Sequence, residues 1–430
     1  MYLNWPSVAL VACAVPLAIV SARSELVWVW LVLVGLLVAL DVALTASPRR
    51  LAARRDVPAS VRRLEPTTST ILIANPTGRG VRGLVRDAWQ PSAGSTGERH
   101  RLDLPAGEMR RMKTPLTPQR RGDLAAGPVV VRLIGPLRLA GRQLSMPVSA
   151  TLRVLPEFSS RRHLPSRLAR LRELDGRSAV RVRGAGSEFD SLREYVDGDD
   201  VRSIDWRATA RRSEVVVRTW RPERDRRVLI LVDTSRHAAA RVGDQPRLDT
   251  SIEAALLLSA LASKAGDRVE VIAFDRTVRA HVRGVSGPAL MAAVANQLAP
   301  LQPRLVEADW AGAAAVIGEA LSQRALVAVL TSIDPAAIES GMLRALGPVA
   351  RNHQVVVASV DDPEVIEMIS SRGDALDVYG AAAATRFDLE RNGVADRLRK
   401  KSINVVSADP ERIAPALADR YLELKAAGKL

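Results

Sequence analysis

The chain has 430 residues, more than an ordinary domain of about 100–200 residues, so two or three structural units are expected. It carries 62 basic and 47 acidic residues, for a formal net charge of +15. Aromatic residues make up only 3% of the chain, and arginines are spread along it among acids, so it lacks the basic, aromatic-rich face typical of nucleic-acid binding. The single cysteine, Cys13, excludes an intramolecular disulfide and a cysteine-based metal cage.

Two apolar segments lie within residues 1–47. Residues 5–21 form the first, and residues 26–44, interrupted only by Asp41, supply the roughly 20 residues that a helix needs to cross a bilayer. The short connection between them permits only a tight turn, which predicts a transmembrane helical hairpin. A cleaved signal peptide is disfavoured because no charge precedes the first segment and a longer apolar segment follows it.

Arginines follow the second apolar segment directly, at Arg49, Arg50, Arg54 and Arg55. An excess of basic residues beside a membrane span marks the cytoplasmic side. We therefore expect a cell-membrane protein with two spans, with both termini and the large soluble part in the cytoplasm.

Residues 57–156 show short alternating apolar runs that are cut by glycine and proline. Several short strands at spacings of about 8–12 residues predict a β-sandwich-like domain. No nucleophile or acid–base pair stands out in it, which favours a structural or protein-binding module. Residues 157–226 form a basic linker followed by a densely charged segment.

Residues 227–430 change to strand–helix alternation. The apolar run at residues 228–232 is typical of a strand buried on both faces, and residues 248–264 have helical spacing. The pattern predicts a doubly wound α/β domain. Further strands are expected at residues 269–274, 325–330, 355–360 and 403–406, and helices at 288–298, 310–322, 338–351, 381–400 and from 410 to about 425.

Oxygen-bearing side chains stand where the predicted strands end. Asp233 and Ser235 follow the first strand, Thr331 and Asp334 follow another, and the pair at residues 361–362 follows a third. Ligands of such sheets bind beyond the carboxyl ends of the strands, and Mg²⁺ prefers oxygen ligands of this kind. The sequence therefore predicts a ligand site at this edge.

Asp233-x-Ser235 after a buried strand resembles the start of the metal-ion-dependent adhesion site of von Willebrand factor type A domains. More specific is the block from Gly186 to Tyr195, continued from Gly198 to Ala210. It is similar to the signature of domain-of-unknown-function family 58 (DUF58), bacterial proteins in which the block precedes a type A fold. The resemblance extends over nearly the whole chain.

This resemblance implies a membrane hairpin, a β-domain and a C-terminal type A-like, Rossmann-like domain. Members of the family typically stand in the genome beside a MoxR-type AAA+ ATPase. This gene neighbourhood implies an adaptor or chaperone-like role in the maturation of proteins at the envelope, with the ATPase as partner.

The predicted metal site departs from the type A pattern. His237 stands where a second serine is expected, and Asp309 where a threonine ligand usually lies. Two alternatives stay open: a Mg²⁺ site, and a degenerate, metal-free site held by hydrogen bonds. A neutral imidazole prefers softer metals, which favours the second alternative. The candidate ligands are Asp233, Ser235, Asp309, Thr331 and Asp334.

Arginines alternate with acids in the signature segment, which suits an ionic network of arginine forks and carboxylates. Such a network either pins the linker against the sheet or presents a docking surface with Trp206 as anchor, because tryptophan and arginine dominate interface hot spots. The residues singled out are Arg193, Tyr195, Asp199, Asp200, Arg202, Asp205, Trp206 and Arg207.

No constellation for catalysis is visible in the sequence. Ser235 lies near His237, but no Gly-x-Ser-x-Gly elbow surrounds the serine, and the chain has no phosphate-binding P-loop. The sequence thus favours a non-catalytic, membrane-anchored protein-interaction module. A Mg²⁺-dependent adhesion-type receptor is the alternative and a hydrolase is third; neither a small-molecule substrate nor nucleic acid is expected.

Overall fold

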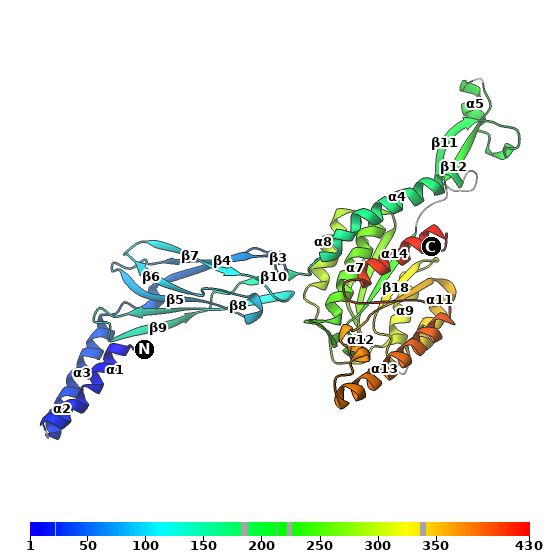
Figure 1. Cartoon of the computed structure of the whole chain (residues 1–430). Helices are drawn as coiled ribbons and strands as arrows, with labels where there is room; N and C mark the ends of the chain where they lie inside the picture. The colour runs from blue at the N-terminus through cyan, green and yellow to red at the C-terminus, as the bar shows by residue number, and fades with distance from the viewer. Residues whose placement is uncertain (22, 182–187, 213, 222–225, 336–340) are drawn as a thin grey trace. The chain divides into compact units, whose positions relative to one another are not determined.

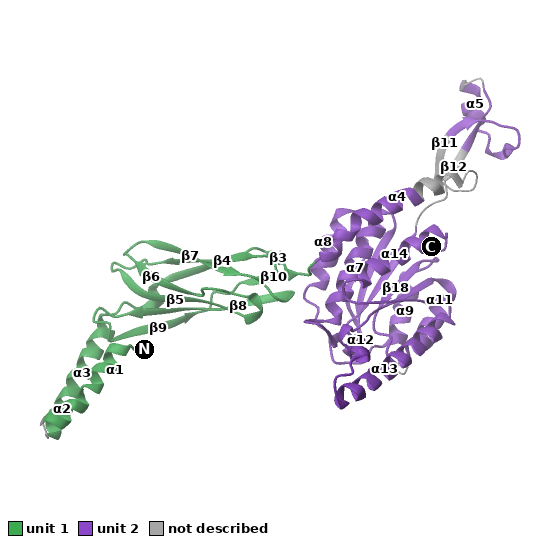
Figure 2. Ribbon diagram, in the orientation of Figure 1, with its two compact units in different colours: residues 1–157 green, residues 158–430 purple. Residues whose placement is uncertain are grey.

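The computed structural model describes residues 1–21, 23–181, 188–212, 214–221, 226–335 and 341–430. The chain divides into two compact units, residues 1–157 and residues 158–430 (Figures 1 and 2). Each unit has its own hydrophobic core.

Unit 1 begins with three apolar helices, α1 (Trp5–Ala12), α2 (Ala14–Ser21) and α3 (Ser24–Leu44). Within the described residues, α3 is the one helix that is long and apolar enough to cross a membrane. Helices α1 and α2 pack against it, and Trp30 Nε1 donates a hydrogen bond to the carbonyl oxygen of Leu10 at 2.9 Å. The expected first span is the shorter apolar stretch Trp5–Val20.

The rest of unit 1 consists of two β-sheets whose buried apolar side chains form two clusters. One sheet has the order β1-β9-β8-β10-β3, with β5 and β6 added through β8, and the other has the order β2-β4-β7. Inward-facing side chains alternate with exposed ones, as in β5, so both sheets bury one face. The strands are β1 (Tyr2–Leu3), β2 (Ala52–Asp56), β3 (Ser60–Arg62), β4 (Thr67–Ala74), β5 (Val81–Trp89), β6 (Arg99–Leu104), β7 (Met109–Leu116), β8 (Gly122–Ile134), β9 (Ala140–Met146) and β10 (Thr151–Leu155).

The β-domain therefore takes in strands upstream of residue 57, where the sequence placed its start. Strand β2 carries Arg55, whose guanidinium pairs with Asp87 on β5 at 2.7 Å, and both side chains are fully buried. Arg55 also donates to the carbonyl oxygen of Gly127. Because breaking a buried pair leaves an uncompensated charge, this contact fixes how the two sheets face each other.

A buried carboxylate joins the last part of α3 to the β-domain. Asp41 accepts hydrogen bonds from the backbone N–H groups of Leu137, Leu139 and Ala140 at 2.7, 2.9 and 2.9 Å, all in or beside the turn between β8 and β9. Gly135 is required there, since a Cβ atom would lie 2.3 Å from Asp41 Oδ1. The one charge that interrupts the apolar segment is thus a structural link.

Unit 2 contains a six-stranded sheet with the order β17-β16-β13-β18-β19-β20. All neighbours are parallel except β17, which is antiparallel to β16. Numbered along the chain, this order is 3-2-1-4-5-6, the doubly wound order in which ligands bind where the winding reverses. The strands are β13 (Arg227–Asp233), β16 (Arg268–Phe274), β17 (Val278–Val282), β18 (Leu326–Leu330), β19 (Gln354–Val360) and β20 (Asn404–Ala408).

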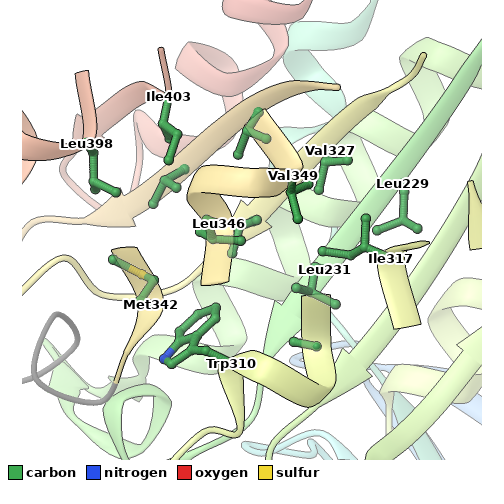
Figure 3. Packing of buried hydrophobic residues seen from close by; sticks show 14 of the residues in the cluster. Leu229, Leu231, Trp310, Ile317, Val327, Met342, Leu346, Val349, Leu398 and Ile403 are labelled. Atoms are coloured by element: carbon green, nitrogen blue, oxygen red, sulfur yellow. The ribbon is translucent and has the colours of Figure 1, made fainter. Parts of the chain in front are cut away.

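Helices cover both faces of this sheet. On one face α9 (Trp310–Ala320), α11 (Met342–Asn352) and the end of α13 (Ala375–Arg399) pack on the strands, with Trp310 buried beside Met342 (Figure 3). Helices α7 (Arg247–Lys264) and α14 (Ile413–Ala426) contact each other and the strands, and α8 (Pro288–Leu298) lies against α7 and β17. Shorter or peripheral elements are η1 (Pro48–Arg50), η3 (Ser159–His163), α4 (Leu164–Arg181), α6 (Arg236–Ala239), β14 (Arg241–Val242), β15 (Gln245–Pro246) and α12 (Pro363–Ser370).

Most elements of unit 2 lie close to where the sequence pattern predicts them, and two differences have local causes. Helix α13 begins at Ala375, six residues before its predicted start, because Asp374 caps it by accepting from the Asp377 N–H. Helix α12 was not predicted; Asp362 caps it in the same way. The first residues of the helix expected at 338–351 lie outside the described residues, and α11 follows them.

A buried polar trio fastens α14 to the loop before β16. Lys425 Nζ donates to Asp267 Oδ1 at 2.9 Å, and the Tyr421 hydroxyl donates to Asp267 Oδ2 at 2.5 Å. The three side chains are almost completely buried. Since each charge is paired, the trio joins the end of the chain to the sheet without leaving a buried charge alone.

Candidate functional site

The winding of the sheet reverses between β13 and β18, and three predicted site residues lie there. Asp233 ends β13, Thr331 follows β18, and the Thr331 hydroxyl donates to Asp233 Oδ2 at 2.6 Å. The backbone N–H of Ser235 donates to Asp233 Oδ1 at 2.8 Å. Asp233 and Ser235 are 1% and 0% exposed. The structure therefore brings Asp233, Ser235 and Thr331 together, with both carboxylate oxygens already hydrogen-bonded.

Asp334 pairs with His237 beside this group. Its Oδ2 lies 3.3 Å from His237 Nδ1 and accepts from the Ser332 hydroxyl at 3.0 Å. His237 Nε2 lies 3.7 Å from Oε2 of Glu307, whose other oxygen pairs with Arg236 at 2.7 Å. The His237 imidazole thus uses Asp334 as its partner.

Asp309 caps helix α9. Its Oδ1 accepts from the backbone N–H of Gly312 at 3.0 Å, and its own backbone N–H donates to the Asp275 carbonyl. A Cβ atom at Gly312 would lie 2.5 Å from Asp309 Oδ2, so the glycine permits this cap. A carboxylate at a helix N-terminus is stabilised by the unpaired N–H groups there.

Burial and charge shift the titration of the groups at this edge. Burial raises the pKa of the Asp233 carboxyl, against the opposing effect of its hydrogen bond from Thr331. The hydrogen bond to Asp334 raises the pKa of His237. Burial also lowers the pKa of Arg247, which begins α7. Burial raises the pKa of Asp361, which pairs with Arg391 at 2.6 Å.

The five candidate ligands do not together fit a magnesium ion. Mg²⁺ requires near-octahedral oxygen ligands at about 2.0–2.1 Å, but Asp309 is engaged as a helix cap and Asp334 by His237 and Ser332. In the part of the chain that the structure describes, no group of three or more His, Cys, Asp or Glu side chains is placed to hold a metal. The donor set at this edge therefore does not match the coordination that Mg²⁺ requires.

A groove of 620 Å³ lies between α9 and α11, next to the Asp309 cap. Its lining is mainly small and apolar, with Trp310 and the polar side chains of Asp309, Arg344, Asn352 and His353. Burial lowers the pKa of His353, which favours its neutral form. A groove of this composition suits an apolar segment better than a polar substrate.

The signature segment, which belongs to unit 2, contains a two-stranded sheet of its own. Strands β11 (Glu188–Glu194) and β12 (Val216–Arg221) pair antiparallel, and η4 (Val201–Ser203) and α5 (Trp206–Arg212) lie between them in sequence. Gly186 and Ser187 of the signature lie outside the described residues. The Tyr195 N–H donates to the Val215 carbonyl at 2.8 Å, which continues the pairing.

The acids of this segment hold its own backbone and arginines. Asp199 pairs with Arg193 at 2.6 Å, and that hydrogen bond lowers the pKa of the Asp199 carboxyl. Asp205 accepts from two backbone N–H groups of α5 and pairs with Arg218 at 2.8 Å. Asp200 caps η4 by accepting from the Arg202 N–H. These contacts lie within the segment, so they shape it rather than attach it to the sheet.

Apolar side chains stand exposed on the same segment. Trp206 is 69% exposed, and Val196 and Val201 are 60% and 61% exposed. The side chains of Arg202 and Arg207 are exposed as well. We call these five residues the Trp206 surface; its large aromatic side chain and arginines have the composition of an interface hot spot.

Comparison with known families identifies this half of the chain. Residues 191–403 match the family described as "Protein of unknown function DUF58". We call residues 191–403 the DUF58-matching region. It includes the Trp206 surface, Asp233 and the strands of the sheet as far as β19.

The chain also has relatives among mycobacterial proteins. The chain is 26% identical over 190 residues to "Uncharacterized protein Rv1480" of Mycobacterium tuberculosis and to "Uncharacterized protein Mb1516" of Mycobacterium bovis. The alignment covers 44% of this chain and 59% of each relative, so it spans about three fifths of their length.

Similar solved structures cover only about a quarter of the chain. They include the CARDB domain of the PF1109 protein from Pyrococcus furiosus, in complex with di-metal ions, which is 16% identical and covers 24% of this chain and 91% of that one at a TM-score of 0.19. A FixG-related protein from Vibrio parahaemolyticus is 10% identical and covers 24% and 96% at a TM-score of 0.16. Scores this low carry no argument about fold or function.

Proposed function

We propose that this protein is a membrane-anchored, non-catalytic interaction module. In this proposal α1–α2 and α3 form two spans, and both termini and the soluble part lie in the cytoplasm. Its partner is a MoxR-type AAA+ ATPase, with which it acts as an adaptor in maturing proteins at the envelope. The apolar α3 and the arginines after it support the anchor and its orientation.

The exposure of Trp206 is the observation that carries this proposal. A tryptophan that is 69% exposed on a segment braced by its own ion pairs is poised for a partner, because large exposed aromatics dominate interface energetics. Among the described residues, the ion pairs that brace this segment come from Arg193, Asp199, Asp205 and Arg218, and the Trp206 side chain stays exposed.

The C-terminal domain is proposed to be type A-like. Support comes from the strand order, from the position of Asp233-x-Ser235 where the winding reverses, and from the link between Asp233 and Thr331. Asp233 is buried with both oxygens hydrogen-bonded, so it offers no accessible base or nucleophile. This arrangement supports binding and not bond cleavage.

A binding experiment tests the proposal. The full-length protein in detergent is titrated with a purified MoxR-type ATPase from the same organism, for the parent chain and for Trp206→Ala and Arg207→Ala. We expect Trp206→Ala to raise the dissociation constant at least about tenfold, because a residue that anchors an interface contributes much of its binding free energy. Tyr379→Ala is the matched control, because Tyr379 on α13 is an aromatic residue with 76% exposure.

Unchanged affinity in both Trp206→Ala and Arg207→Ala would remove the docking surface from the proposal. Absence of binding by the parent chain would remove the ATPase as partner.

A Mg²⁺-dependent adhesion-type receptor is the second candidate, favoured by one observation. The Ser235 hydroxyl oxygen is buried beside Asp233 and is a hard oxygen donor of the kind that Mg²⁺ binds. Calorimetric titration with Mg²⁺ and Mn²⁺ decides: we expect no binding heat. Clear binding that Asp233→Ala abolishes would favour this candidate instead.

A further inference from the structure

Both ends of the apolar helical region meet the same turn of the β-domain. At the end of α3, Asp41 holds the backbone of residues 137–140. At the start of α1, the Asn4 side chain donates to the Arg138 carbonyl at 3.1 Å, and the Asn4 N–H donates to the Leu139 carbonyl at 2.9 Å. The turn between β8 and β9 is therefore fixed at the base of the helices.

A strand pairing reinforces this attachment. Strand β1 pairs with β9, and the Tyr2 hydroxyl donates to the Leu133 carbonyl at 3.2 Å. Gly141 permits the approach, since a Cβ atom there would lie 2.8 Å from the Tyr2 ring. With contacts from two chain segments, the turn cannot move independently of the helix ends.

The segments at this base are basic and partly apolar. Residues 1–4, 45–50 and 135–142, which we call the helix-base collar, contain Arg49, Arg50, Arg138 and Arg142 and no acidic residue. The arginines at 49, 50 and 138 are exposed. Leu3 and Leu137 are 63% and 46% exposed. Exposed apolar side chains among arginines are typical of a surface at the membrane–water interface.

We propose that the helix-base collar binds anionic lipid headgroups and that Leu137 enters the bilayer interface. This inference rests on the proposed membrane anchor and adds that the β-domain itself contacts the lipid surface. Arginines beside the membrane are attracted by the negative surface potential of anionic lipids, over about a Debye length. The hydrogen bonds to Asp41 hold Leu137 and Arg138 beside the end of α3, where the proposal places the membrane surface.

A fluorescent probe tests the contact in the full-length protein. Cys13 is the one cysteine and is replaced by serine, and a single cysteine is introduced by Leu137→Cys and labelled with an environment-sensitive dye. The protein is reconstituted into nanodiscs of phosphatidylcholine alone or mixed with phosphatidylglycerol. Arg120→Cys is the control, because it precedes the 13-residue strand β8 that Leu137 follows, which places it about 40 Å away at roughly 3.3 Å per residue.

We expect a blue-shifted emission from position 137, larger with phosphatidylglycerol, and an unshifted emission from position 120. Replacing Arg49, Arg50 and Arg138 by glutamine, or adding salt, should reduce the extra shift that phosphatidylglycerol causes. Equal shifts in both lipid mixtures would overturn the anionic-lipid contact. So would a shift at position 137 in lipid-free detergent that grows with protein concentration, because it would indicate a second copy of the chain.

The same samples separate this inference from the proposed anchor. Failure of the protein to co-elute with nanodiscs would contradict the anchor itself. Co-elution with identical spectra at positions 137 and 120 would contradict the collar contact alone.

Discussion

Two buried aspartates, Asp41 and Asp233, accept hydrogen bonds from different kinds of partner. Asp41 at the end of α3 is fully buried and accepts three backbone N–H groups from a turn some hundred residues along the chain. Asp233 at the end of β13 is 1% exposed and accepts one backbone N–H, two residues away, and one hydroxyl. The Asp41 carboxylate joins helix α3 to the β-domain. The Asp233 carboxylate links the ends of two neighbouring strands, β13 and β18, within one sheet.

The difference lies in which donors depend on each carboxylate. The N–H groups bound by Asp41 belong to an irregular turn, so the carboxylate supplies hydrogen bonds that a strand partner would otherwise provide. Thr331, in contrast, brings a hydroxyl that can rotate to another role. We therefore expect Asp41 to be the less replaceable of the two.

The largest effect is expected from Asp41→Ala. It leaves buried N–H groups without acceptors, which should lower the free energy of local opening at the β8–β9 turn by about 3 kcal/mol. Hydrogen exchange of the Leu137, Leu139 and Ala140 amides in the full-length protein should quicken roughly a hundredfold. The control is Asp123→Asn in the exposed pair with Arg153, expected to change stability by less than about 1 kcal/mol. Unchanged exchange in Asp41→Ala would mean that the turn is held without the carboxylate.

Asp233 should show a smaller loss and a strong dependence on the replacement. Asp233→Ala removes the acceptor for the buried Ser235 N–H and should cost about 2 kcal/mol in urea unfolding. Asp233→Asn keeps one oxygen for that N–H and an amide for Thr331, so its cost should stay below about 1 kcal/mol. Burial raises the pKa of Asp233, so its ionisation opposes folding as pH rises above about 3.9, and asparagine removes that penalty. Equal losses in both variants would argue that the charge itself is needed, as a metal site would require.

The smallest effect concerns pH and His237. The hydrogen bond to Asp334 raises the pKa of this imidazole above its ordinary value of about 6.5. The stability it contributes is fully present below that ordinary value and is lost as pH rises through the higher folded-state pKa. An NMR titration of the His237 ring should give a lower pKa in Asp334→Asn than in the parent chain. His163, whose pKa is lowered by burial and which lies outside this site, serves as the internal reference. A parent pKa for His237 that Asp334→Asn leaves unchanged would show that the pair does not form in solution.

The sequence predicts the α/β region well because its signals are local. The continuous apolar run of β13 and the periodic helix α7 lie within a residue or two of their predicted ranges. Parallel topology then places Asp233 and Thr331 at one edge without further information. Asp309 shows the limit of this local prediction. The sequence predicts a metal ligand there because a carboxylate lies near the edge, but Asp309 stands directly before α9 and caps it.

Long-range polar contacts could not be predicted in the same way. In the sequence, Asp41 is an isolated charge in an apolar segment. Its hydrogen-bond donors in the β8–β9 turn are brought to it only by the tertiary fold. Arg55, which reads as one of several arginines marking the cytoplasmic side, is instead buried against Asp87 between two sheets. A partner 32 or more residues away leaves no periodic trace in the sequence, so only the tertiary structure shows these pairs.

The trio of Asp267, Tyr421 and Lys425 has a practical consequence for expression design. Tyr421 and Lys425 stand in the final ten residues, yet both meet a carboxylate more than 150 positions earlier. A fragment that ends before Tyr421 would leave the buried Asp267 carboxylate without its two partners. Such a fragment is therefore expected to fold poorly. An affinity tag appended after Leu430, by contrast, follows the exposed residues 426–429 and leaves the trio intact.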